Sequence, residues 1–333
     1  MTEYYEHKIE KIKEIFGVTN LILTNDSVRV GSVVYPIVDD VIILLHPAQF
    51  PRELAQRLAG WTAVEPPPDA VEKDIQETFG AEWDDFPEIL PEHELEFEQY
   101  FDMVDIDQLR DKTVCDLGCG IGRWSHFLSG RVRDLVLVDF SQAIFVARRN
   151  LAAADNVIFF MGDIRHLPFR DDFADFLICL GVLHHLSGSA LEEVRRVGRY
   201  APRMLIYLYS ALDARPSYYR LLLAPVNLVR RIVWRVRNPV FRSGFTWVGT
   251  FGLYFPLIWF GKALRPFGLA NRIPLYDFYH DKSVKRIRQD VYDRFFTRIE
   301  RRYSRAQIMT LTDTFQKITI SQSIPYWHFL SVR

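Results

Sequence analysis

From Lys112 onward the sequence alternates short apolar runs with amphipathic stretches, and this alternation constrains the fold more than any other feature. The apolar runs are Thr113–Leu117, Leu135–Val138, Val157–Met161, Phe176–Leu180 and Met204–Tyr209. Stretches with helical character lie between them, at Gly122–Ser129, Ser141–Ala153 and Ala190–Tyr200. Apolar runs joined by helices are typical of a parallel sheet that is covered on both faces. We therefore predict a doubly wound α/β fold.

The segments that flank this pattern predict three additions to it. Two β-rich runs at 315–323 and 326–333 suit an antiparallel edge hairpin, which gives a seven-stranded, mostly parallel sheet. The roughly ninety residues before the last helix are too many for a connection, so we predict a helical insertion or lid over 212–303. A β-rich segment followed by "EPPPDA" predicts a small α+β domain over 1–65 and a linker over 66–92. The core then comprises 93–211 and 304–333.

A glycine-rich loop follows the first core strand in the segment "VCDLGCGIGRW", residues 114–124. Glycine is used where the backbone turns tightly or approaches a ligand closely, and open α/β sheets bind ligands at the carboxyl ends of their strands. The spacing of Gly118, Gly120 and Gly122 matches neither a dinucleotide fingerprint nor a phosphate loop. Asp116 would repel a pyrophosphate but would suit a cationic ammonium or sulfonium.

This segment resembles the first motif of class I S-adenosylmethionine-dependent methyltransferases, and three later segments resemble the motifs that follow it. In that family the acid at Asp139 holds the ribose hydroxyls, and the acid at Asp163 pairs with the adenine amino group, with Ile164 beside the ring. The run "FLICLGVLHHL" at 176–186 resembles the motif that lines the sulfonium and the acceptor. The resemblance covers about residues 93–211 plus the C-terminal hairpin and implies S-adenosylmethionine as cofactor. The binding residues that it implies are Asp116, Gly118, Cys119, Gly120, Gly122, Asp139, Phe140, Asp163, Ile164 and Leu180.

His184 and His185 are the candidate catalytic residues, because they follow the fourth core strand at the mouth of the expected site. An imidazole titrates near neutrality and can take a proton from an acceptor hydroxyl. The alternative is that neither acts, since such a pair is common in the family without a catalytic role. Direct methyl displacement needs a base only where the acceptor must first lose a proton. No CxxC pair is present, and the cysteines are expected to pack in the core, so no metal is expected.

The N-terminal segment "VRVGSVVYPIVDDVIILLHPAQF" resembles a small zinc-ribbon-like domain found as a methyltransferase activator. The cysteine pairs of that family are absent here, so the resemblance implies a metal-free version. An unrelated β-rich cap is the alternative. The first sixteen residues are charged throughout and do not read as a secretory signal; together with the few cysteines this favours a cytoplasmic protein.

The insertion has an unusual charge pattern, with ten basic residues and no acid between Ala214 and Tyr276. These charges either neutralise the acid-rich segment at 65–112 or meet an anionic substrate or membrane. Residues 218–237 suit a basic amphipathic helix, and the uncharged run at 243–261 suits an interfacial element, a substrate lid, a contact with a second subunit or, less well, a membrane span. Polar side chains later in the insertion could line an acceptor pocket or simply belong to an amphipathic helix: Tyr276, Tyr279, His280, Tyr292, Asp293 and Arg294.

The hypothesis that best unites these features is a methyltransferase acting on a small or amphipathic, lipid-like organic acceptor. Peripheral membrane contact through 217–262 and formation of a homodimer are both compatible with it. One alternative is methylation of RNA or of a translation protein, which the N-terminal resemblance and the ten basic residues support, although a nucleic-acid partner is not favoured; the net charge of −1 indicates no partner. The other is a non-catalytic cofactor-binding module that regulates a partner. These alternatives differ in salt dependence, in turnover and in binding to vesicles.

Overall fold

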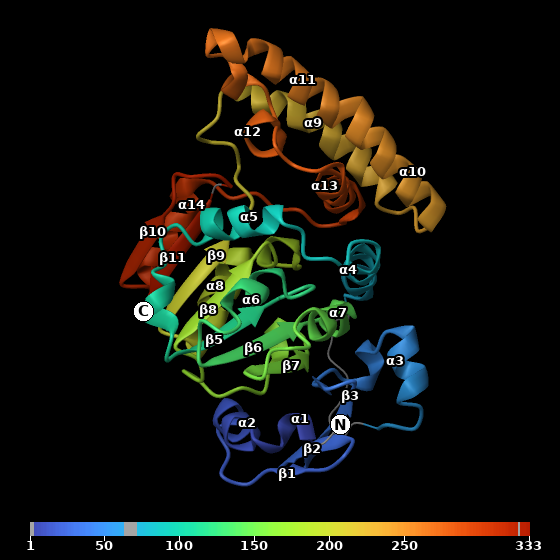
Figure 1. The fold of residues 1–333 in the computed structure, drawn as a ribbon, viewed down its shortest axis with the longest axis vertical. Coiled ribbons are helices and arrows are strands. Elements are labelled where there is room, and N and C mark those ends of the chain that lie inside the picture. The colour runs from blue at the N-terminus through green and yellow to red at the C-terminus, as the bar shows by residue number, and fades with distance from the viewer. Residues whose placement is uncertain (1–2, 63–71, 326) are drawn as a thin grey trace.

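The computed structural model of the chain describes residues 3–62, 72–325 and 327–333. These residues form one sheet in the strand order β1-β2-β3-β4-β7-β6-β5-β8-β9-β11-β10 (Figure 1). The strands are β1 Ile22–Leu23, β2 Ser27–Val30, β3 Val33–Val38, β4 Val41–Ile43, β5 Thr113–Leu117, β6 Asp134–Asp139, β7 Val157–Met161, β8 Phe176–Leu180, β9 Arg203–Tyr207, β10 Lys317–Ile320 and β11 His328–Val332.

The middle of the sheet is parallel, and one edge is an antiparallel hairpin. Strands β4, β7, β6, β5, β8 and β9 pair in parallel, while β11 runs antiparallel to both β9 and β10. All five residues of β5 and of β7 are buried, as expected for strands covered by helices on both faces. The doubly wound α/β fold predicted from the alternation of runs is therefore confirmed.

The N-terminal strands join the main sheet. The sequence instead predicts that they belong to a separate small domain beside a seven-stranded sheet. Val41, Ile42 and Ile43 of β4 pair in parallel with β7, so β1 to β4 extend the sheet to eleven strands in the described residues. The physical reason is that β7 would otherwise leave a row of unpaired backbone groups at a buried apolar edge. The hydroxyl of Tyr5 also donates to the backbone carbonyl of Asp40 at 2.5 Å, which ties the N-terminal helix to this edge. The resemblance to an activator domain stays a prediction.

Helices cover both faces of the sheet. They are α1 Glu3–Glu6, α2 Ile9–Phe16, α3 Arg52–Arg57, α4 Lys73–Asp85, α5 Glu92–Tyr100, α6 Arg123–Leu128, α7 Ala143–Asn150, α8 Ala190–Val197 and α14 Arg305–Met309. The linker expected over 66–92 differs from the structure, because residues 73–85 form α4; residues 63–71 lie outside the described part. Helix α4 forms because it buries Ile75 and packs against α7, and Gln76 Nε2 donates to the carbonyl of Phe140 at 2.8 Å.

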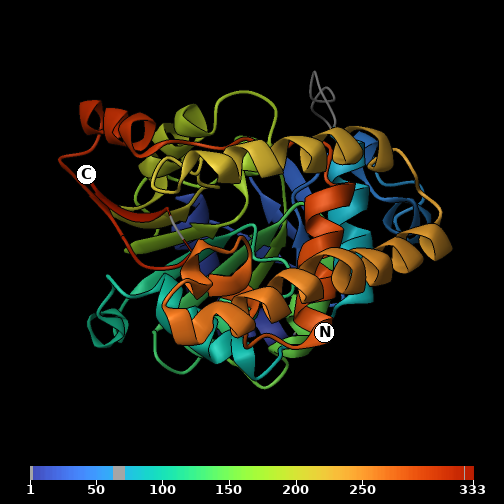
Figure 2. The same ribbon diagram turned by 90° about the horizontal axis from the view of Figure 1, so that it is seen from above.

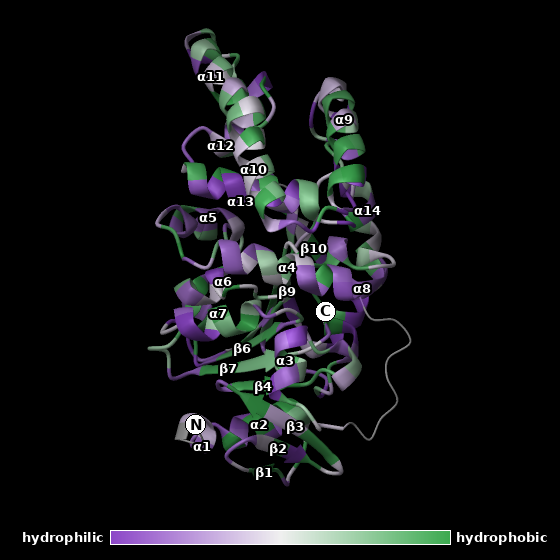
Figure 3. Cartoon of the chain, turned by 90° about the vertical axis from the view of Figure 1, so that its right-hand side faces the viewer, coloured by the Kyte–Doolittle hydropathy of each residue, from purple (hydrophilic) through white to green (hydrophobic). Residues whose placement is uncertain are grey.

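The segment 212–303 is helical, as predicted, and stands on the carboxyl-end side of the sheet. It contains α9 Ser217–Val233, α10 Pro239–Gly249, a π-helical turn η6 Thr250–Tyr254, α11 Phe255–Leu264, α12 Tyr276–Tyr279 and α13 Val284–Phe296. Helix α9 and the continuous rod α10–η6–α11 project from the body as two separate arms (Figure 3). Helix α13 packs against both arms and against α4, and Figure 2 shows it running between the arms. No helix among the described residues is long and apolar enough to cross a membrane.

Candidate functional site

A cavity of about 930 Å³ lies between the carboxyl ends of the parallel strands and the insertion. One half, which we call the loop half, is lined by the glycine loop and by residues at the ends of β6, β7 and β8. The other half, the insertion half, is lined by α4, by both arms and by α13. The predicted residues that line the cavity are Gly118, Cys119, Gly120, Asp139, Phe140, Asp163, Ile164, Leu180 and His185.

The glycine loop needs its glycines for two separate reasons. Gly118, Gly120 and Gly122 all have a positive φ, of 76°, 54° and 74°, which side chains rarely tolerate. A Cβ atom on Gly118 would also lie 2.4 Å from Cγ2 of Val182, so the loop could not approach the segment after β8. Gly118 and Gly120 line the cavity, whereas Gly122 faces α7 and serves the packing of the loop.

Asp139, at the end of β6, is held rigidly at the cavity wall. Its Oδ2 accepts the backbone N–H of Gly120 at 2.8 Å, and its Oδ1 accepts the N–H and the hydroxyl of Ser141 at 2.8 and 2.7 Å. Burial raises the pKa of Asp139, and these hydrogen bonds oppose that shift. The carboxylate therefore braces the glycine loop and retains lone pairs toward the cavity for hydroxyl donors.

Asp163, after β7, is engaged by a neighbouring cation. Arg165 donates to it through Nε at 3.1 Å, through Nη2 at 2.8 Å and through its backbone N–H at 3.0 Å. Burial would raise the pKa of Asp163, but Arg165 outweighs burial and the net shift is downward. Arg165 also pairs with Glu72 at 3.1 Å and lines the cavity. A ligand amino group at this carboxylate would share it with Arg165.

Asp116 lies away from the cavity that the sequence expected it to line. It is 1% exposed, and its Oδ2 accepts the hydroxyl of Ser125 on α6 at 2.7 Å. Burial raises its pKa to about 7, and the hydrogen bond from Ser125 opposes this only in part. Asp116 is thus a fully buried group beneath the loop. The expectation that its carboxylate faces a cationic ligand is therefore wrong.

The two histidines have different surroundings. His184 is fully buried, stacks on the ring of Tyr209 with centroids 3.9 Å apart, and does not line the cavity. Burial lowers its pKa well below the usual value, and its ring nitrogens find no hydrogen-bond partner in the described residues. His185 lines the cavity, with Nδ1 2.7 Å from the carbonyl of Ile299 and Nε2 3.8 Å from Oδ1 of Asp293. Of the two, only His185 can meet a substrate.

Asp293 of α13 completes the surroundings of His185. It accepts the hydroxyl of Tyr209 at one oxygen and that of Thr297 at the other, the latter at 3.1 Å. Asp293 and Tyr209 both line the cavity. Of the polar residues that the sequence offered for an acceptor pocket, Tyr279, Asp293 and Arg294 line the cavity, whereas Tyr276, His280 and Tyr292 do not.

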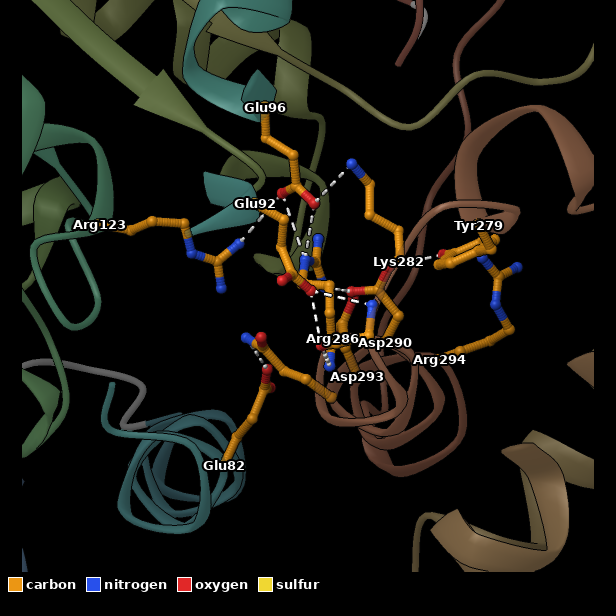
Figure 4. Close-up of polar contacts among 12 residues, drawn as sticks. Glu82, Glu92, Glu96, Arg123, Tyr279, Lys282, Arg286, Asp290, Asp293 and Arg294 are labelled. Carbon is orange, nitrogen blue, oxygen red and sulfur yellow. Dashed lines mark hydrogen bonds and ion pairs between the residues drawn. The ribbon is translucent and has the colours of Figure 1, made fainter. Parts of the chain in front are cut away.

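A buried cluster of charges fixes α13 to the core beside the cavity (Figure 4). Glu96 of α5 accepts Nε of Arg286 at 3.0 and 3.2 Å, and Nζ of Lys282 lies 3.7 Å from the same carboxylate. Arg286 also pairs with Asp290 one turn later, and Nη1 of Arg123 lies 4.0 Å from Glu96. Glu96 and Arg286 are 0% and 5% exposed, so this contact between core and insertion is dry.

Arg123 and Glu82 line the cavity, and each has buried side-chain atoms without a hydrogen-bond partner in the described residues. Arg123 directly follows the glycine loop, and its Nε and Nη2 are buried with no hydrogen-bond partner in the described residues. Its guanidinium carbon lies 5.1 Å from the ring centre of Trp83. Glu82 accepts Gln289 Nε2 at 3.4 Å, and burial raises its pKa well above the usual value. Arg123 thus reaches Glu96 only through Nη1, at 4.0 Å, while its Nε and Nη2 have no hydrogen-bond partner in the described residues. Sequence reasoning did not single out Arg123 or Glu82, although the position of Arg123 after the glycines was visible.

Much of the remaining wall of the insertion half is apolar, although Arg215, Asp277 and Asp290 also line it. The apolar lining residues come from both arms and from residues 273–278: Leu222, Leu223, Val226, Val229, Phe245, Val248, Leu253, Leu257, Ile273, Leu275 and Phe278. A mostly hydrophobic wall with a few placed polar groups is typical of a pocket for an organic ligand. In the described residues no group of three or more metal-ligating side chains occurs.

Comparison with known proteins finds similarity in the part of the chain that contains the glycine loop. Residues 114–200 match the methyltransferase domain family. The uncharacterized methyltransferase YcgJ of Bacillus subtilis is 32% identical over 101 residues, which cover 29% of this chain and 40% of that protein. The solved structure of YcgJ aligns with 40% of this chain and with 58% of the YcgJ chain. The sequence identity is 26% and the TM-score is 0.34.

Two further relatives have more specific names. A demethylmenaquinone methyltransferase of Clavibacter sepedonicus is 32% identical over 123 residues, covering 36% of this chain and 45% of that protein. A protein of Mus musculus named as a probable tRNA methyltransferase 9B is 29% identical over 112 residues. These residues cover 31% of this chain and 23% of that protein. The chain spans less than half the length of each of these curated relatives. The segment 114–200 that matches the methyltransferase domain family contains the glycine loop, β5 from Val114 onward and strands β6 to β8.

Proposed function

We propose that the protein transfers a methyl group from S-adenosylmethionine to a hydroxyl group of an amphipathic organic acceptor. The observation that carries the proposal is that one cavity joins the glycine loop to an apolar chamber, with His185 and Asp293 in its wall. Two relatives are named as a demethylmenaquinone methyltransferase and a ubiquinone biosynthesis O-methyltransferase, which supports an organic acceptor. The long insertion supplies most of the wall of this chamber.

The residues of the loop half fit this cofactor. The absence of a Cβ at Gly118 lets the glycine loop pack against Val182 at the cavity wall, and Asp139 offers lone pairs that suit two ribose hydroxyls. The unpartnered Nε and Nη2 of Arg123 suit the carboxylate of the cofactor's amino-acid part. Ile164 and Phe140 add apolar contacts in the same half. When bound, S-adenosylmethionine supplies a methyl group activated by its positively charged sulfur.

His185 is the proposed general base. If its Nδ1–H donates to the carbonyl of Ile299, then Nε2 carries the lone pair and can take a proton from an acceptor hydroxyl in the cavity. The imidazolium formed would be stabilised by Asp293, whose Oδ1 lies 3.8 Å away. The apolar walls exclude water, and the cavity holds the acceptor oxygen and the cofactor together, which supplies much of the rate through proximity.

The test combines binding with turnover. Titration calorimetry with S-adenosylmethionine is expected to show binding that Asp139→Asn weakens and that Arg123→Met weakens separately. Incubation with methyl-labelled cofactor and a lipid extract is then expected to label an organic-soluble product. Absence of cofactor binding by folded protein refutes the proposal. Binding without labelling of any extract favours a non-catalytic cofactor-binding module.

RNA methylation is the second candidate, because the arms carry exposed cations and one relative is named for tRNA. The same labelling experiment with total tRNA in place of the lipid extract separates the two. RNA binding would weaken steeply with salt, whereas binding of an apolar acceptor would not. Labelled tRNA with unlabelled lipid would establish this candidate instead of ours.

A further inference from the structure

The outer face of α9 is apolar although nothing in the described chain covers it. Leu221, Leu228 and Ile232 are 74%, 60% and 65% exposed. They are spaced seven and four residues apart, so they lie on one stripe of the helix. A stripe of this kind on an exposed helix normally packs against another surface.

The second arm carries an exposed aromatic stripe. Trp247, Phe251, Phe255 and Trp259 recur every four residues, and successive ring centres lie 5.0 to 5.7 Å apart. Trp247, Phe251 and Trp259 are 43%, 50% and 62% exposed, and Phe267 just beyond the helix is 73% exposed. Figure 3 shows both arms at the end of the molecule farthest from β1, where they stand clear of the sheet.

The charge around these stripes has one sign. No Asp or Glu occurs from Ala214 to Tyr276. Some cations of this segment are neutralised by acids elsewhere: Arg215 pairs with Asp277, Arg230 with Glu300 and Arg237 with Glu77. The remaining exposed cations form no ion pair in the described residues; they are Arg220, Arg231, Arg235, Lys262, Arg265 and Arg272. Neutralisation by the acid-rich segment thus accounts for only part of the basic charge.

The apolar surface of the arms continues into the cavity. Leu222 and Val229 of α9 and Val248 of α10 are 51%, 40% and 70% exposed, and all three also line the cavity. The two arms pack on α13 rather than closely on each other, so the apolar lining reaches the surface between them. The apolar part of the cavity wall is therefore continuous with exposed apolar surface on both arms.

We propose that the arms dock on an anionic lipid membrane and that the acceptor's apolar chain enters the cavity between them directly from the bilayer. Arginines and lysines beside tryptophan and phenylalanine suit the interface of an anionic bilayer, where cations meet the headgroups and rings reach the acyl boundary. Docking stands on the surface alone, whereas acceptor entry rests on the proposed methyltransferase function. The arms lie in the interface and do not span the bilayer.

The test is sedimentation of the full chain with phosphatidylcholine vesicles, with and without phosphatidylglycerol. We expect binding that increases with phosphatidylglycerol. Trp259→Ser with Phe260→Ser should weaken it about tenfold or more. Arg231→Gln with Arg235→Gln should weaken it by about fivefold per removed charge, and only on the anionic vesicles.

Matched control variants come from the opposite end of the molecule. Ile22 of β1 is 59% exposed, so Ile22→Ser removes a comparable apolar side chain there. Arg29→Gln with Arg52→Gln removes two exposed cations there. Both controls are expected to bind vesicles as the wild type does. Equal losses in controls and arm variants would indicate non-specific adsorption and would overturn the proposal.

Two further results would overturn docking while leaving the methyltransferase proposal standing. The first is no vesicle binding by protein that still methylates a detergent-dispersed acceptor. The second is a stable dimer, seen by sedimentation velocity, that the arm variants dissociate, because the arms would then cover each other. Conversely, vesicle binding by protein that does not bind S-adenosylmethionine would support docking and refute the methyltransferase.

Discussion

Nε2 of His185 lies 3.8 Å from Oδ1 of Asp293, although the first residue follows strand β8 of the core and the second belongs to helix α13 of the insertion. The separation is longer than a hydrogen bond, so the two groups attract chiefly when the imidazole is protonated. The insertion therefore does more than cover the cavity, since it supplies the carboxylate that would stabilise a charged histidine.

Replacing His185 by Gln should remove the proton acceptor while keeping a polar side chain. We expect kcat to fall by about 10²- to 10⁴-fold with KM for the cofactor nearly unchanged. Asp293→Asn should cause a smaller loss, since the imidazole remains.

The matched control for this experiment is His126→Gln, an exposed histidine on α6. It should leave kcat as in the wild type. A His185→Gln enzyme with full activity would show that the acceptor needs no base from this residue.

Gly118→Ala should damage the site more than an alanine at a comparable glycine elsewhere. Gly130 has a φ of 77°, close to the 76° of Gly118, but a Cβ there would meet nothing within 4 Å. Both variants carry the left-handed backbone cost of about 1–2 kcal/mol. Only Gly118→Ala also forces Val182 aside, and it should lose cofactor binding. Chemical denaturation and calorimetry on both proteins give the comparison; equal losses of stability and of binding would contradict it.

Asp116→Asn should stabilise the protein at alkaline pH. The pKa of Asp116 is raised to about 7 in the folded state from 3.8, so the unfolded chain releases this proton at lower pH than the folded chain does. The unfolded state therefore binds fewer protons than the folded state between about pH 4 and 7. The free energy of unfolding falls by up to about 4 kcal/mol as the pH rises through that range. Asparagine removes this loss. Urea unfolding at pH 5 and pH 8 measures it, and a variant less stable than wild type at pH 8 would contradict the assignment.

Arg286→Met should destabilise the protein by about 3–5 kcal/mol, because it leaves the buried Glu96 without its hydrogen-bonded cation, with Lys282 3.7 Å away. Adding Glu96→Gln to the same chain should recover part of that loss. The contrasting pair is Arg195 with Asp313 at 2.8 Å, which lies at the surface, so Arg195→Met should cost less than about 1 kcal/mol. Similar effects of the two arginine variants in urea unfolding would argue against a buried cluster joining core and insertion.

The core strands could be predicted because a strand that is buried on both faces is an unbroken apolar run in the sequence. Observed β5, β7 and β8 have the predicted bounds, since each is an unbroken apolar run between helices. The pairing of β4 with β7 has no such pattern in the sequence, because it depends on which distant edge a short apolar strand finds. The N-terminal segment therefore looked like a domain of its own.

The candidate site was predictable where its residues follow strand ends in order. Asp139, Asp163 and His185 line the cavity as expected from their positions. Asp116 does not, because a residue inside a fully buried strand points where the pleat directs it, here toward Ser125. Arg123 was missed because its unpartnered atoms appear only when α4, α5 and α13 surround it.

Strand β4 has a consequence for the order in which the chain can fold during synthesis. Val41 pairs with Phe159, so the first strands leave the ribosome long before the edge that completes them exists. Until β7 emerges and is itself aligned on β6, the early meander can satisfy only one side of β4. This late, long-range pairing adds non-local contacts of the kind that slow folding, and it makes the N-terminal meander one of the segments that a chaperone would meet exposed.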